Sequence, residues 1–183
     1  MADEQHTKAT LFRLRSAPCM LLPDLWSPRI MLYADGIQEA AFAGREFAGD
    51  TDDVLIVRGA AREWVLDAKT GVLMRDGPPT DIKIVSLDRQ TIDGWSAELV
   101  RIAGFDHAIL VAPGATLFDG PFPGWGLVTK CWALSSALGW GFSPSGRTLM
   151  LVGPGMVWSY VRESVALGSV EQAEQGAAAD PAA

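Results

Sequence analysis

Histidine and cysteine are scarce in this chain. Among 183 residues there are only two histidines, His6 and His107, and two cysteines, Cys19 and Cys131. The cysteines lie far apart and fit no metal-ligand spacing, so we expect two reduced thiols packed as small apolar side chains. A serine or cysteine nucleophile would have to be paired with His107, because His6 lies in a polar leader. Few side chains are therefore available for acid–base chemistry.

Motifs of several enzyme classes are also missing. The Gly-Pro-Gly string at residues 153–155 follows an apolar run, but it lacks the Lys and the Ser or Thr of a phosphate-binding loop. No Gly-x-Ser-x-Gly nucleophile elbow is present. The acidic cluster of Asp50, Asp52 and Asp53 lacks the spacing of a calcium loop, and we expect it to form a solvated turn. We expect no metal and no cofactor, and we lean towards a protein that is not an enzyme.

Long apolar runs and basic clusters are absent as well. No stretch approaches the roughly 18 apolar residues of a membrane helix, and residues 20–22 are too short for the core of a signal peptide. The formal charge is −7 and the pI is about 4.7. An acidic chain repels phosphate backbones, so we expect no nucleic-acid partner and no membrane partner. We expect a cytoplasmic protein, whose charge serves solubility or complements a basic partner protein.

What is present is the composition of a globular protein. Hydrophobic residues make up 49% of the chain and charged residues 20%. This composition can bury a substantial core and is too apolar for a disordered chain. We expect a single β-rich domain over residues 1–168. Residues 169–183 hold little that could pack, and they predict a disordered or frayed tail.

Runs of β-forming residues ahead of glycine turns are the main structural signal. Such runs are typical of β-hairpins. They lie at residues 29–33 before Gly36, 54–57 before Gly59, 108–111 before Gly114 and 148–152 before Gly153. Asp67 and Asp88 begin two further turns, where a carboxylate can accept hydrogen bonds from the next amides. Residues 82–85 are a further strand candidate.

Two segments have helical periodicity instead. Apolar side chains recur at helical spacing at Leu127, Cys131, Leu134 and Leu138, which predicts a helix over residues 126–138. Residues 96–103 are a second helix candidate. The predicted fold class is mainly β (α+β). We expect an antiparallel sheet of several hairpins curled against one or two helices.

Two stretches are similar to blades of β-propellers. Residues 50–76 resemble a quinoprotein-type repeat, mainly through the string Leu-Asp-Ala-Lys-Thr-Gly at 66–71. Residues 142–158 resemble a WD40 blade, with Phe-Ser-Pro-Ser-Gly-Arg-Thr-Leu at 142–149 and Val-Trp at 157–158. The resemblance implies a small or partial β-propeller as the alternative fold.

A loop rich in proline, glycine and aromatic residues is the candidate contact surface. Residues 113–126 contain three prolines, four glycines, two phenylalanines and a tryptophan. Prolines reduce the entropy lost on binding, and aromatic side chains anchor interfaces. Phe118, Phe122 and Trp125 are predicted to bind a partner, with Asp119 at the rim. The alternative is that the three rings fold inward and pin the loop to the core.

The resulting functional hypothesis is a non-catalytic protein-binding domain of the adaptor or toxin-neutralising (immunity) type. It would act through the aromatic loop and the acidic surface on another protein, and a basic partner would complement its charge. The alternative is a small-ligand-binding protein or an enzyme that uses His107 and the tryptophan-rich segment 125–158. That segment includes Trp132, Trp140 and Trp158. The oligomeric state is left open.

Overall fold

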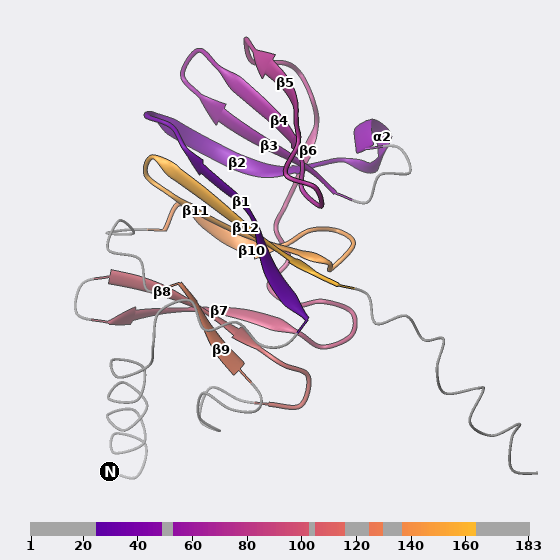
Figure 1. The fold of residues 1–183 in the computed structure, drawn as a ribbon, viewed down its shortest axis with the longest axis vertical. Coiled ribbons are helices and arrows are strands. Elements are labelled where there is room, and N and C mark those ends of the chain that lie inside the picture. Colours follow the sequence, from indigo (N-terminus) through magenta and orange to yellow (C-terminus); the bar gives the residue numbers. More distant parts are fainter. Residues whose placement is uncertain (1–24, 49–52, 103–104, 116–124, 130–136, 164–183) are drawn as a thin grey trace, which may run out of the picture.

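Three antiparallel sheets are stacked as layers in the computed structural model of the chain (Figure 1). The structure describes residues 25–48, 53–102, 105–115, 125–129 and 137–163. The four-stranded sheet lies in the middle, with the five-stranded sheet on one side and the three-stranded sheet on the other. The predicted fold class, mainly β with antiparallel sheets, is confirmed.

The order of strands differs from their order along the chain in two of the sheets. From edge to edge, the five-stranded sheet contains β5 (Leu73–Gly77), β4 (Glu63–Asp67), β3 (Val54–Gly59), β2 (Ile37–Ala43) and β6 (Ile84–Val85). The four-stranded sheet contains β1 (Trp26–Tyr33), β12 (Met156–Arg162), β11 (Thr148–Gly153) and β10 (Gly139–Phe142). The three-stranded sheet contains β7 (Ser96–Ile102), β8 (Phe105–Val111) and β9 (Trp125–Thr129).

The four-stranded sheet is buried on both faces. Along β11, Leu149 and Leu151 pack in a cluster that includes residues of the three-stranded sheet. The alternate residues Met150 and Val152 pack in a cluster with the five-stranded sheet. Successive side chains of a strand point to opposite faces, so a strand covered on both sides reads as a continuous apolar run. This explains why residues 148–152 carry no polar alternation.

Aromatic side chains join the three-stranded sheet to the middle layer. Trp26 of β1 meets Trp95, which precedes β7, edge to face with ring centroids 5.6 Å apart. Phe142 of β10 lies 5.8 Å from Trp26, also centroid to centroid. All three side chains are buried. Burial of rings of this size makes the contact a large part of the core.

A second core layer covers the outer face of the five-stranded sheet. Val54 and Ile56 of β3 form a small cluster against which Ala48 and Ile84 pack. Ala48 ends α2 (Arg45–Ala48), which has only four residues. In the described part of the chain no helix is both long enough and apolar enough to cross a membrane.

The four predicted hairpin entries are confirmed. β1, β3, β8 and β11 each lead into one of the glycine turns, and β2, β4 and β12 return from three of them. The run after Gly114 and the tail at 169–183 lie outside the described residues. The turn at Asp67 is also confirmed, because its Oδ1 accepts hydrogen bonds from the amides of Lys69 (2.8 Å) and Thr70 (3.1 Å).

Both helix predictions are wrong where the structure describes them. Residues 125–129 form β9, in which Leu127 pairs with Ile109 of β8. Residues 96–102 form β7, in which Leu99 pairs with Ala108. The buried strand β8 supplies hydrogen-bonding partners on both of its sides, and tertiary pairing overrides local periodicity. Residues 130–136 lie outside the described residues.

The two blade-like stretches belong to different sheets. Residues 54–76 form β3, β4 and most of β5 in the five-stranded sheet, whereas 142–158 contribute to β10, β11 and β12 in the four-stranded sheet. Each is a set of antiparallel strands joined by hairpin turns, which is the local structure that the repeats share. The described strands close into neither a barrel nor a propeller.

Candidate functional site

The predicted contact loop falls largely outside the described residues. Phe118, Asp119 and Phe122 fall within residues 116–124, which the structure does not describe. Trp125 is the first residue of β9, where its backbone pairs with Val111 of β8. The loop therefore stays a prediction, and the structure brings none of its four residues into a described site.

His107, the candidate catalytic histidine, is buried in the centre of the three-stranded sheet. It lies on β8, the middle strand, and its exposed fraction is only 4%. Its neighbour Asp106 accepts hydrogen bonds from Arg101 Nε (2.8 Å) and the amide of Ala137 (2.8 Å). The Arg101 guanidinium holds the pKa of the Asp106 carboxyl below its usual value. The Asp106 carboxylate therefore has a structural role, because it joins β8 to Arg101 of β7 and to the backbone of Ala137.

A buried carboxylate also organises the five-stranded sheet. Glu63 of β4 is fully buried and accepts hydrogen bonds from Arg58 Nε (2.8 Å) and Arg75 Nη1 (2.7 Å), as well as from the Thr80 hydroxyl. Burial alone would raise the pKa of Glu63, but the bonds from Thr80, Arg58 and Arg75 hold it below the usual value. The cluster ties β3, β4 and β5 to the loop that carries Thr80.

Asp53 is buried, although the sequence predicts a solvated turn for it. Its Oδ2 accepts hydrogen bonds from Thr148 Oγ1 (2.7 Å), Ser145 Oγ (2.8 Å) and Ser143 Oγ (2.9 Å). The prediction fails at this residue because the hydroxyls come from the β10–β11 hairpin, which is distant in sequence. The carboxylate bridges the five-stranded and four-stranded sheets, which is a structural role.

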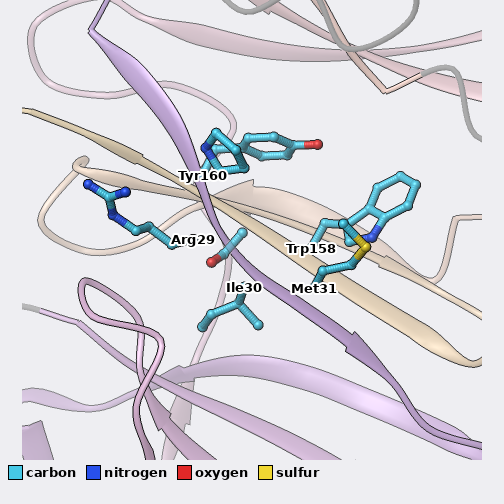
Figure 2. Close-up of a pocket in the computed structure, with 7 residues that line it drawn as sticks. Arg29, Ile30, Met31, Trp158 and Tyr160 are labelled. Carbon is cyan, nitrogen blue, oxygen red and sulfur yellow. The ribbon is translucent and has the colours of Figure 1, made fainter.

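A small apolar cavity lies over the pairing of β1 with β12 (Figure 2). Its volume is about 130 Å³. The register of the pair shifts between Pro28 and Ile30, so Arg29 is the extra residue of a bulge. Met31 and Trp158, which are cross-strand partners, extend together to one side of the pair. This volume lies below the 300–1,000 Å³ or so that is typical of ligand pockets.

A larger groove, of about 470 Å³, is lined by both the five-stranded and the four-stranded sheets. We call it the inter-sheet groove. Its lining residues are Gln38, Glu39, Ala40, Ser86, Leu87, Arg89, Leu138, Gly139 and Val152. The groove lies near one edge of each sheet. β6 is the edge strand of the five-stranded sheet and has only two residues, and β10 is the edge strand of the four-stranded sheet.

The linker after β6 closes one side of the groove. Asp88 forms an isolated bridge with Phe142 of β10, and the amide of Phe142 donates to the Asp88 carbonyl at 2.7 Å. Gly141 makes this close approach possible. A Cβ atom there would lie 2.5 Å from the Asp88 carbonyl oxygen, and the φ of Gly141 is +145°, a backbone conformation that other residues rarely adopt.

Arg89 is the basic residue of the groove, and its guanidinium lies over Trp140 with 3.6 Å to the ring centroid. No carboxylate pairs with it among the described residues, whereas Arg62, which stacks on Trp64, is bound to Asp76. Desolvation by burial lowers the pKa of Arg89, but an arginine remains charged at neutral pH. Glu39, the acidic residue of the groove, is bound to Arg58 at 3.3 Å. A charge that its own fold does not neutralise suits an anionic group from outside.

No protein-family model, curated protein or solved structure matches this chain. No group of three or more His, Cys, Asp or Glu side chains in the described ranges is arranged to hold a metal ion.

Of the residues at or beside the groove, the sequence signals Trp140 and gives no signal for Arg89 or Ala40. Trp140 belongs to the tryptophan-rich segment named in the alternative hypothesis and contacts Arg89 of the groove, whereas His107 lines neither of the two cavities described above. Arg89 and Ala40 carry no sequence signal of a site. Arg89 stacks on a residue 51 positions away, and no motif encodes such a contact.

Proposed function

We propose that the chain is a non-catalytic protein-binding domain of the adaptor or toxin-neutralising (immunity) class, and that it binds its partner at the inter-sheet groove. The observation that carries this proposal is Arg89. Its guanidinium lies over Trp140, 3.6 Å from the ring centroid, at a groove of about 470 Å³, and it has no carboxylate partner in the described part of the chain. An arginine on an aromatic ring is typical of interface anchors.

The partner contributes a carboxylate to the groove. A guanidinium forms paired hydrogen bonds with a carboxylate, and its immobilisation on Trp140 reduces the entropy lost on binding. The remaining surface belongs to a chain of net charge −7, so basic residues of the partner would fit around the groove. The proposal involves no cofactor, nucleic acid or membrane, and it places the domain in the cytoplasm.

A displayed library of linear peptides tests this proposal. We expect selection on the immobilised protein to enrich peptides that carry Asp or Glu at one fixed position. Arg89→Leu should weaken binding of the best such peptide about tenfold or more, because hydrogen bonds to charged groups contribute about 1.5–3 kcal/mol. Fluorescence anisotropy with the labelled peptide measures the change.

The matched control is Arg62→Leu, which removes another arginine that stacks on a tryptophan. Arg62 is already bound to Asp76 and does not line the groove, so its loss should leave peptide binding unchanged. A selection without enrichment, or equal binding to the Arg89→Leu variant and the native protein, would contradict the proposed function.

A further inference from the structure

The strand that lines the inter-sheet groove has one open edge. β2 pairs with β3 from Ile37 to Phe42, but on its other side β6 pairs only with Phe42 and Ala43. In the described part of the chain no strand continues along residues 37–41 on that side. An open edge of this kind is a template for another strand.

The backbone of Ala40 faces this open side. The amide of Gly44 donates to the carbonyl of Lys83 at 2.9 Å, which shows that Gly44 faces the β6 side. Backbone groups of alternate residues in an antiparallel strand point to the same edge. Phe42 pairs with Val85 there, and Ala40 is the next residue of the same set. Its N–H and C=O therefore point away from β3 and towards the groove that Ala40 lines.

The course of β6 explains why this edge is free. After Val85 the chain leaves β2, and Asp88 bridges to Phe142 on the neighbouring sheet. The departing linker brings Arg89 to the groove beside the vacated edge. The groove is thus lined by the backbone N–H and C=O of Ala40 and by Arg89, which has no carboxylate partner among the described residues. It lies at the position where the five-stranded sheet could continue.

We propose that an extended, carboxylate-bearing segment of the partner protein binds as an added β-strand beside Ala40, with its carboxylate on Arg89. This inference rests on the proposed function and adds the mode of recognition. Backbone hydrogen bonds to the sheet edge supply sequence-independent affinity, and the arginine supplies selectivity for the acidic residue. Gly139 and Val152 of the four-stranded sheet also line the groove, so the added strand would lie beside that sheet as well.

Backbone methylation of the bound peptide tests this mode without changing the protein. The probe is the best Asp- or Glu-bearing peptide from the library selection, with each amide N-methylated in turn. Because alternate residues of a strand face the same edge, we expect methylation at alternate positions to weaken binding about tenfold or more. Methylation at the intervening positions should have little effect.

Hydrogen exchange at Ala40 gives an independent measurement by NMR. The Ala40 amide should exchange at least about tenfold more slowly when this peptide is bound. A peptide that binds through Arg89 but is insensitive to N-methylation and leaves Ala40 exchange unchanged would overturn strand addition and leave the proposed function standing. An Ala40 amide already protected in the free protein, in a concentration-dependent manner, would assign the edge to a second copy of the chain and also overturn the proposal.

Discussion

Individual charged residues of this protein mostly serve the fold. Glu63 binds Arg58 and Arg75, and Asp106 binds Arg101. These acids are buried, and a buried carboxylate is stable only when its hydrogen bonds are made. Arg89 differs from these arginines because its contact is a ring and not a carboxylate. This difference separates the candidate binding residue from the structural ion pairs.

Glu63 should give the protein a defined sensitivity to acid. Its folded-state pKa lies below the usual value, so its contribution to stability is complete above the unfolded-state pKa of about 4.3 and is lost as the pH falls through the folded-state pKa. We expect Glu63→Gln to lower the free energy of unfolding by about 3 kcal/mol at neutral pH, because it breaks a buried pair. The difference from the native protein should shrink below about pH 4.

Urea unfolding of the native protein and the Glu63→Gln variant across this pH range measures the effect. Glu39→Gln is the matched control, because it removes a half-exposed carboxylate from the same arginine, Arg58. It should change the free energy of unfolding by less than about 1 kcal/mol. A Glu63→Gln effect that is the same at every pH would show that the carboxylate charge is not the cause.

At the scale of elements, short strands and close approaches determine the groove. β6 ends after two residues, and the linker then crosses to β10, where Gly141 admits the Asp88 carbonyl. The segment after β6 therefore connects an edge of the five-stranded sheet with an edge of the four-stranded sheet. A longer β6 would pair with all of β2 and would occupy the edge that the proposal assigns to a partner.

Gly141→Ala tests this close approach. The added Cβ would lie 2.5 Å from the Asp88 carbonyl oxygen, and the φ of +145° is itself unfavourable. We expect the free energy of unfolding to fall by about 3 kcal/mol or more. Gly36→Ala is the control, because its φ of +72° is also positive but nothing lies within 4 Å of the added atom. It should cost only about 1–2 kcal/mol, and equal losses in denaturant titrations would contradict the prediction.

At the scale of the whole molecule, the four-stranded sheet holds the three layers together. Its strands β1 and β12 come from opposite ends of the described chain and pair along most of their length. One face packs against the five-stranded sheet and the other against the three-stranded sheet. We expect the three layers to unfold together, because neither outer sheet keeps its inner face buried without the middle sheet.

Trp95→Ala tests this cooperativity. Trp95 is buried against Trp26 between two layers, and its removal should lower the free energy of unfolding by about 3–5 kcal/mol. The transitions measured by near-UV and far-UV circular dichroism should still coincide. Trp64→Ala, at a partly buried position on the five-stranded sheet, should cost less. A separate early transition with little loss in the main one would show that the three-stranded sheet unfolds independently.

The sequence by itself determined the hairpins. The apolar runs at 54–57 and 148–152 are continuous because both faces of β3 and β11 are covered, and glycine turns mark where the chain reverses. These signals are local, so they can be read without knowing the neighbours. The same local reading predicted helices over β7 and part of β9, because the pairing of these strands with β8 leaves no trace in their own periodicity.

Only the tertiary structure decided which layers meet and where a site could form. The stacking of Arg89 on Trp140, the open edge at Ala40 and the burial of Asp53 under three hydroxyls all join residues that are distant in the chain. Each depends on the order of the sheets and on the point at which β6 ends. Strand order is fixed by the free energy of burying whole faces, which is a property of the assembled layers and not of any one segment.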